Sequence, residues 1–255
     1  MLFHRIIPTL LMSRGRIVKG QNFKNHKYIG DPTNVVKIFN DKEVDELIIL
    51  DVDATASGKA IDYEYVKVLA EECFMPLCYG GGIANIEQAR RLFSIGVEKV
   101  SIQSAALDNP ELILAIAQEF GSQSIAVSID VATTFFGKYQ LYQASSKEHK
   151  KKPWLEHIKR CVDLGAGEVI LTSVKHEGLL KGIDQKLISD TAKELSVPLV
   201  AGGGISSLDD IKLAIQSGAS AVAVGSFFIF HGPHRAVLVS VPAREIIEAK
   251  LGDIL

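Results

Sequence analysis

The chain has 255 residues, of which 47% are hydrophobic and 23% are charged, and its formal net charge at pH 7 is −2. This composition is typical of a globular protein with a substantial core, and the near-zero charge predicts no general attraction to nucleic acid or to acidic membranes. Three cysteines without C-x-x-C spacing favour neither a disulfide framework nor a zinc site. No apolar run is long enough to cross a bilayer. We therefore expect a cytoplasmic protein that needs no metal and no cofactor.

Short β-branched runs alternate with longer amphipathic segments along the whole chain, which is the pattern of parallel strands joined by crossover helices. One amphipathic segment covers residues 63–72. The expected strands, in chain order, cover residues 5–10, 46–52, 76–79, 99–102, 124–130, 168–172, 198–201 and 221–224. Eight strands of near-continuous apolar character suit a closed barrel, in which both faces of each strand are covered. The sequence predicts a single (β/α)8 TIM barrel over residues 1–255, of the phosphate-binding type.

An internal repeat runs through the chain. Residues 76–83 read PLCYGGGI, and residues 198–205, at an offset of 122, read PLVAGGGI. The same offset, without a gap, pairs Gly96 with Gly218, and it also pairs Glu46 with Glu168. A fixed repeat of half the chain length predicts two four-strand half-barrels, at about residues 1–122 and 123–255, which descend from a doubled ancestor.

Each Gly-Gly-Gly run follows an expected strand and opens an expected helix. Glycine lets backbone N–H groups approach an anion, and the N-terminus of the helix adds a favourable dipole. A serine follows the next strand in both copies of the repeat. A tight turn alone would also use glycine, but two copies, each with its serine, favour a phosphorylated ligand with an anion at each end. The expected phosphate-binding residues are Lys19, in the long loop after the first strand, and Gly81, Gly82, Ser104, Gly203, Gly204, Gly225 and Ser226.

Charged residues also stand at both ends of the expected strands. Asp130 closes an apolar strand, so its carboxylate is expected to point into the mouth of the barrel as a general acid or base; a helix cap or a loop hydrogen bond is the alternative. At the opposite end, two cations and two anions each begin a strand and would form a charged ring across the floor of the barrel. Such a ring fits a gate or an ordinary ion-pair plug equally well. Its expected members are Arg5, Glu46, Lys99 and Glu168.

Runs along nearly the whole chain resemble the cyclase subunits of imidazole glycerol phosphate synthase. These runs are RII at 5–7, GRIVKG at 15–20, YGGGI at 79–83, KVSI at 99–102, FGSQ at 120–123, GAGE at 165–168 and GGG at 202–204. The resemblance implies a lyase that forms a heterodimer with a glutaminase subunit. It also implies that ammonia from the glutaminase enters through the four floor residues, which act as a gate, and that Asp130 is one of two catalytic carboxylates.

The sequence departs from that family at the mouth of the barrel. Leu11 stands where the second catalytic aspartate is expected, and residues 173–179 read SVKHEGL where the family usually reads SIDRDGT. These departures, with residues 102–104 and 230–238, resemble a divergent second branch that is linked to surface-polysaccharide genes. That branch implies ammonia transfer to a phosphorylated or nucleotide-sugar acceptor, for amidino groups on sugars. The alternatives are the orthodox cyclase of histidine biosynthesis, and a non-catalytic conduit that activates the glutaminase and passes ammonia to a separate amidotransferase.

Overall fold

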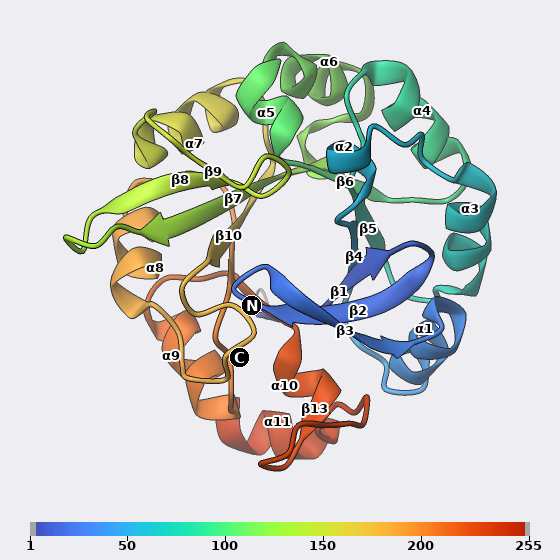
Figure 1. Ribbon diagram of the computed structural model, residues 1–255, viewed down its shortest axis with the longest axis vertical. Helices are drawn as coiled ribbons and strands as arrows, with labels where there is room; N and C mark the ends of the chain where they lie inside the picture. The colour runs from blue at the N-terminus through green and yellow to red at the C-terminus, as the bar shows by residue number, and fades with distance from the viewer. Residues whose placement is uncertain (1–3, 253–255) are drawn as a thin grey trace.

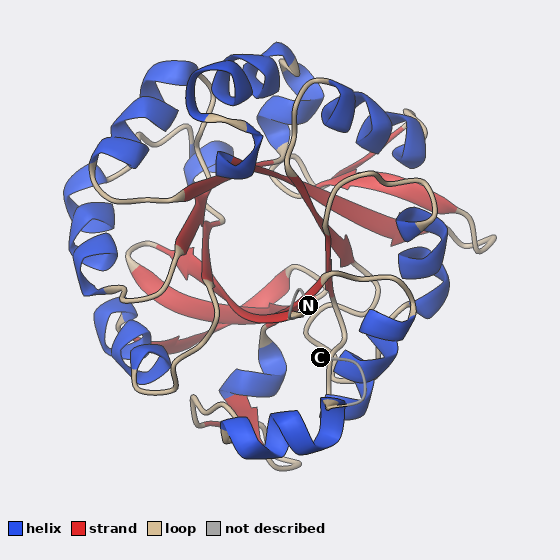
Figure 2. Cartoon of the chain, turned by 180° about the vertical axis from the view of Figure 1, so that it is seen from behind, coloured by secondary structure: helices blue, strands red, loops and turns tan. Residues whose placement is uncertain are grey.

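The computed structural model describes residues 4–252. Eight parallel strands pair in the order β10, β11, β12, β1, β4, β5, β6, β7, and β10 also pairs with β7, so the sheet closes on itself. Helices surround this closed sheet on its outer side (Figures 1 and 2). The chain is therefore a (β/α)8 barrel, as the alternation of strands and helices predicts.

All eight expected barrel strands are present. They are β1 (Arg5–Ser13), β4 (Leu47–Asp51), β5 (Leu77–Gly80), β6 (Lys99–Ile102), β7 (Ile125–Thr133), β10 (Glu168–Ser173), β11 (Leu199–Gly202) and β12 (Ala221–Val224). The bounds of β6 and β12 agree with the prediction to the residue. The strands β1 and β7 run three residues past the predicted ends, because each continues beyond the barrel into an antiparallel hairpin.

Several helices begin at a residue whose side chain caps them. Asp31 accepts from the N–H of Asn34, and Asn85 forms a reciprocal capping box with Gln88. The helix at 63–72 has the predicted bounds. The helices are α1 (Pro32–Asn40), α2 (Ala54–Ser57), α3 (Tyr63–Glu72), α4 (Ile86–Ser94), α5 (Ser104–Asp108), α6 (Glu111–Phe120), α7 (Trp154–Asp163), α8 (Gln185–Ala192), α9 (Leu208–Gln216), α10 (Ser226–Ile229) and α11 (Arg244–Leu251), with one 3₁₀ turn, η1 (Ser122–Ser124).

Six further strands were not predicted. They are β2 (Arg16–Gln21), β3 (Lys24–Gly30), β8 (Tyr139–Gln143), β9 (Glu148–Lys150), β13 (Phe230–His231) and β14 (Ala236–Val237). The antiparallel strands β2 and β3, which continue from β1, replace the open loop that was expected after the first strand, and Lys19 lies in β2. The glycines at 15 and 20 interrupt the apolar run, so the segment reads as a loop in the sequence although its backbone pairs with β1.

The apolar side chains form two cores, one on each side of the strands. Along β4, for example, Ile48 points into the barrel while Leu47 and Ile49 pack outward against the helices. The barrel interior contains Ile7, Ile48, Cys78, Ala126, Ile170, Val200, Ala221 and Ala223, with Leu50 packed against them. The hydroxyls of Ser101 and Ser128 pair with each other at 2.7 Å above this layer, and the charged side chains of the barrel interior lie at its two ends.

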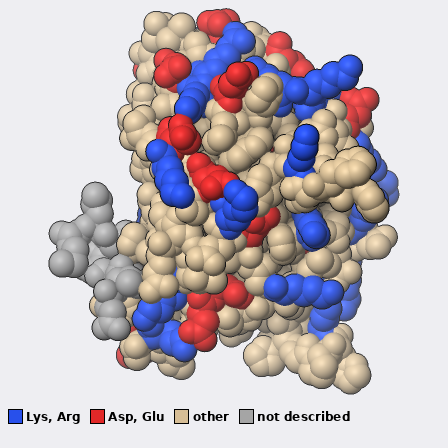
Figure 3. All heavy atoms as spheres, turned by 90° about the vertical axis from the view of Figure 1, so that its left-hand side faces the viewer, with Lys and Arg blue, Asp and Glu red and all other residues tan. Residues whose placement is uncertain are grey.

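The surface carries charges of both signs. On the side that Figure 3 shows, lysine and arginine side chains are interspersed with acidic ones, in keeping with the small net charge. Within residues 4–252, no helix combines the length and the apolar character needed to cross a membrane.

The element bounds repeat at the offset found in the sequence. The strands β5 and β11 are 122 residues apart, as are the helices α4 and α9 and the strands β6 and β12. These matching bounds support the division into two half-barrels, at about residues 1–122 and 123–255, which we keep as a proposal.

One prediction concerns the first glycine run. Gly81 has φ +112°, and a Cβ added there would stand 2.2 Å from the carbonyl oxygen of Asp51. Replacing Gly81 with alanine should therefore lower the free energy of unfolding by about 2 kcal/mol or more, since both strain and a backbone clash oppose it. Gly58 also has positive φ, +63°, but an added Cβ there meets nothing within 4 Å, so Gly58→Ala is the matched control. Denaturant melts should show the larger loss for Gly81→Ala; equal losses would contradict the clash.

Candidate functional site

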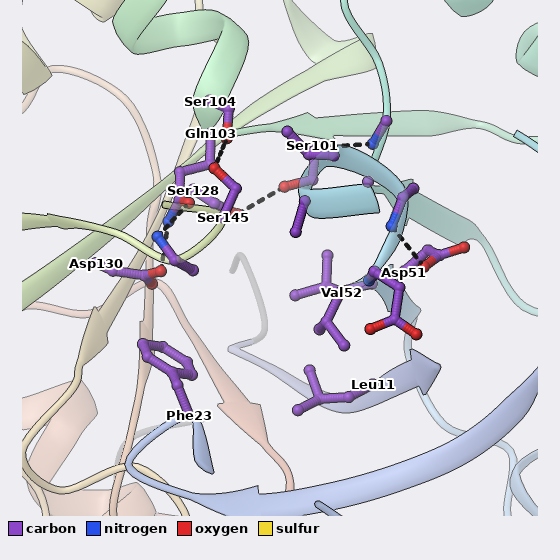
Figure 4. Close-up of a pocket in the computed structure, with 18 of the residues that line it drawn as sticks. Leu11, Phe23, Asp51, Val52, Ser101, Gln103, Ser104, Ser128, Asp130 and Ser145 are labelled. Atoms are coloured by element: carbon purple, nitrogen blue, oxygen red, sulfur yellow. Dashed lines mark hydrogen bonds between the residues drawn. The ribbon is translucent and has the colours of Figure 1, made fainter. Parts of the chain in front are cut away.

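A cavity of about 1050 Å³ opens at the carboxyl ends of the barrel strands. Residues from both halves of the chain line it, including Leu11 and Asp51 from the first half and Asp130 and Glu177 from the second. Figure 4 shows two different walls, with Asp130, Gln103 and Ser128 on one side and Leu11 and Val52 on the other. A concave site of this size, with a few converging polar groups, is the usual form of a small-molecule site.

Asp130 is the buried carboxyl group of this cavity. Its side chain accepts a hydrogen bond from Nε2 of Gln103, whose Oε1 in turn accepts from the backbone N–H of Ala144 at 3.2 Å. Burial raises the pKa of Asp130 to about 7, and the negative charge of Glu177 acts in the same direction, against the hydrogen bonds from Gln103 and Thr172. A carboxyl group with this pKa can both take and give a proton near neutral pH.

Leu11 faces Asp130 across the cavity (Figure 4). In the sheet, Leu11 of β1 is paired with Leu50 of β4 and with Val18 of β2, so its neighbours on both adjacent strands are apolar. Asp51, at the end of β4, accepts from the backbone N–H groups of Asp53 and Ala54 at 3.0 and 3.1 Å and so caps the short helix α2. Leu11 therefore brings no proton-transfer group to this wall, and Asp51, whose pKa is raised by burial, is the carboxyl group beside it.

The first glycine run lies open in the cavity. Gly81 and Gly82 both have positive φ, and the N–H of Gly82 donates to the hydroxyl of Thr55 at 3.2 Å. Ser104 opens α5, and its Oγ lies 2.8 Å from Oγ of Ser145. An anion that binds here exchanges the Thr55 contact for its own oxygen atoms, which are stronger acceptors.

The second glycine run borders the large cavity at Gly202 and Gly203, and it also borders a much smaller pocket. Gly203 and Gly204 both have φ +95°, and with Gly225 and Ser226 they line a pocket of about 10 Å³. The hydroxyl of Ser226 is buried at this pocket and has no hydrogen-bond partner among residues 4–252. Since buried polar atoms rarely stay unpaired, this hydroxyl indicates a place for a small polar group.

Lys19 joins the β2–β3 hairpin to this second run. Its side chain is only 3% exposed and forms an ion pair with Glu177, in the segment after β10. Its ammonium also lies directly against Gly225, beside the second run, since a Cβ added to Gly225 would stand 2.3 Å from Nζ. Lys19 therefore contacts both the expected phosphate site and a carboxylate beside it.

At the opposite end, the four charged residues of the floor form one closed ring. Arg5 contacts Glu46 at 2.5 Å and also contacts Glu168, while Lys99 lies 2.8 Å from Glu46 and 2.7 Å from Glu168. The signs alternate, so each ion has two opposite neighbours. Burial by itself would lower the pKa values of Arg5 and Lys99, but the two glutamates raise both above their usual values. Both cations therefore stay charged at neutral pH.

Comparison with known proteins gives the family. Residues 5–234 match the model of the "Histidine biosynthesis protein" family. A Pseudomonas aeruginosa protein, provisionally named imidazole glycerol phosphate synthase subunit hisF2, is 46% identical over 95% of this chain and 97% of its own. The HisF subunit of that synthase from Exiguobacterium sibiricum is 36% identical over 98% of both chains. This chain belongs to the HisF family of imidazole glycerol phosphate synthase cyclase subunits.

The HisF-like site contains contacts that sequence reasoning missed. Gln103 directly follows β6 and Asp130 lies in the neighbouring strand β7, so their contact could have been inferred from the strand order. Glu177 lies in the run that departs from the family, but its pairing with Lys19 spans 158 residues of sequence and depends on the unpredicted hairpin. Nothing in the sequence indicates that Thr55 accepts a hydrogen bond from Gly82.

The buried carboxyl of this HisF-like chain predicts a pH dependence. The folded state holds the proton of Asp130 up to about pH 7, whereas the unfolded chain releases it near pH 4, so this residue makes folding less favourable as pH rises from 4 to 7. Asp130→Asn removes the effect. The variant should gain stability relative to wild type over that interval, by a few kcal/mol at about 1.4 kcal/mol per pKa unit. Urea melts at pH 4.5 and 7.5 measure it, and a difference that does not change with pH would refute it.

Proposed function

We propose that this chain is the synthase subunit of a cytoplasmic glutamine amidotransferase. It receives ammonia from a glutaminase partner at the floor of the barrel and adds it to a phosphorylated acceptor at the mouth. The observation that carries the proposal is the arrangement of one barrel: a closed charged ring at one end, two glycine runs with Asp130 at the other, and an apolar interior between them.

The interior suits the passage of a small neutral molecule. Ile7, Ile48 and Ala126 are among the side chains that line it, and a neutral ammonia molecule loses far less solvation there than an ammonium ion does. The ring of charges seals the floor against water until one member moves. Lys99 is the member best suited to move, because its long flexible stem carries a compact charge.

The acceptor site has room for an anion at each end. Gly81 and Gly82 offer an open site beside Ser104, and Gly203 and Gly204 offer a second beside Ser226. The apolar residue at position 11 favours an acceptor other than that of the orthodox cyclase, since loss of one of two cooperating acid–base groups costs about 10²–10⁴-fold in rate. We propose an activated sugar as this acceptor, for the synthesis of amidino sugars in surface glycans.

The orthodox reaction is the second candidate. In it, the chain would form imidazole glycerol phosphate and the aminoimidazole carboxamide ribotide from the phosphoribulosyl precursor and ammonia. The two anion sites favour this reading, and so does the 36% identity to relatives that carry the synthase name outright. The name "subunit" on these relatives agrees with a heterodimer.

A conduit that serves a separate amidotransferase is the third candidate. One feature favours it: Phe135 and Phe136, at the tip of the β7–β8 hairpin, are 99% and 87% exposed. The hairpin also carries Asp130, so a protein that covers these two rings would stand beside the mouth of the cavity. Exposed aromatic pairs of this kind are typical of protein contacts.

Turnover assays separate these candidates. The complex of the chain with its proposed glutaminase partner should consume glutamine only when the acceptor is present. We expect turnover of a nucleotide sugar and only slow turnover of the histidine-pathway precursor. Assays with ammonia supplied directly at high pH check that the slow turnover does not come from the glutaminase step. Turnover of that precursor at the rate of an ordinary cyclase would establish the orthodox reaction. The proposal would be refuted if no glutaminase co-purified with the chain and glutamine hydrolysis did not depend on the acceptor.

The ring gives a prediction that separates a gate from a plug. Arg5 bridges both glutamates, so Lys99→Ala leaves neither carboxylate stranded and should cost well under the roughly 3–5 kcal/mol of a broken buried pair. In a gate, ammonia-driven turnover should persist while product formed per glutamine changes. Lys67→Ala, which removes an exposed i,i+4 ion pair, is the control. Thermal melts and paired glutamine and ammonia assays test this; a large stability loss with unchanged coupling would identify a plug.

A further inference from the structure

The proton chemistry of the proposed reaction needs a second group opposite or beside Asp130, and Leu11 does not supply it. We propose that Glu177 is that group, and that an anion bound at Gly203, Gly204 and Ser226 releases it from Lys19. The inference rests on the proposed function, since it assigns a role within the same acceptor site. It concerns one contact, the buried ion pair between the β2–β3 hairpin and the segment after β10.

The first step is a competition for Lys19. The small pocket is lined by Gly203, Gly204 and Ser226, but also by Glu177. A phosphate there would lie beside the carboxylate of Glu177, and two like charges in a buried space repel strongly. Because Nζ of Lys19 already lies against Gly225 of the same pocket, the lysine can pair with the phosphate almost without moving. The anion therefore takes Lys19, and Glu177 has to turn away.

The second step is the new position of Glu177. Glu177 lines the large cavity as well as the small pocket, so its side chain can turn from one into the other. Its backbone carbonyl accepts from the N–H of Asn22 at 2.9 Å, which holds the main chain while the side chain rotates. The charge of Glu177 already acts on Asp130 in the ligand-free state. Turning into the cavity brings the two carboxyl groups to the same ligand.

The carboxyl groups of Asp130 and Glu177 then act together, one as base and the other as acid. When ammonia forms the C–N bond to a carbonyl carbon of the acceptor, the nitrogen loses a proton to one carboxylate. The carbonyl oxygen gains a proton from the other group, which is in its acid form. The number of protons on the pair is unchanged, and no redox partner is needed. One charged and one neutral carboxyl side by side is the usual state of such a pair.

Inorganic phosphate tests the release without an acceptor. With ¹³C-labelled carboxyl groups, phosphate should shift the Glu177 signal and raise the apparent pKa of Asp130 in the wild-type protein. Glu177→Gln should lower the pKa of Asp130 without phosphate and abolish its response to phosphate. Glu148→Gln, an exposed change on β9, is the control and should leave both values as in wild type. Phosphate binding with the Glu177 signal unmoved would overturn the inference, while the proposed function would stand.

Turnover tests the catalytic role. In the complex with its glutaminase, Glu177→Gln should lower kcat by about 10²–10⁴-fold and remove one limb of the pH profile. Adding Leu11→Asp to that variant should restore part of kcat and the lost limb, because a carboxyl then faces Asp130 from β1. A Glu177→Gln effect on KM alone, with an unchanged pH profile, would show that Glu177 only binds Lys19. Absence of phosphate binding at both glycine runs would refute the proposed function and this inference together.

Discussion

Pairing of β10 with β7 closes the barrel, and this closure decides where charged groups inside the barrel can lie. In a closed sheet both faces of each strand are covered, so the interior accepts side chains such as Ile48 and Ala126 and rejects unpaired charge. Charged residues remain only where strands begin or end. The floor therefore holds cations and anions that neutralise one another, and the mouth holds groups that either pair or act on a ligand.

The two ends of the barrel reduce the free-energy cost of buried charge in different ways. At the floor, each of Glu46 and Glu168 contacts both cations, so the ring has no unpaired ion. At the mouth, Asp130 has hydrogen bonds but no cation, and its pKa rises until the group is neutral over most of the acidic range. The floor is thus built to stay charged and the mouth to exchange protons. The same low dielectric produces both behaviours.

Much of this architecture can be predicted from the sequence, because it follows from local patterns. Strand periodicity gives all eight barrel strands, and the residues that begin them place Arg5, Glu46, Lys99 and Glu168 in one layer. The repeat places the two glycine runs. The hairpins are missed because glycines at 15 and 20 interrupt the first apolar run, and because β1 and β7, which continue into hairpins, are expected to end with the barrel. The contact of Lys19 with Glu177 then stays invisible, since it depends on how the first hairpin folds back over the segment after β10.

The two halves carry the same glycine run and the same serine, yet their surroundings differ. At the first run, Gly82 donates to the hydroxyl of Thr55 in an open cavity, a weak contact that an anion replaces easily. At the second, Lys19 is buried and already neutralised by Glu177, and the hydroxyl of Ser226 lies unpaired behind them. An anion at the first site meets no ion pair, whereas an anion at Gly204 and Ser226 lies beside the pair of Lys19 with Glu177. The repeat therefore supplies two similar backbone sites, and only the second couples an anion to a charged pair next to the groups that move protons.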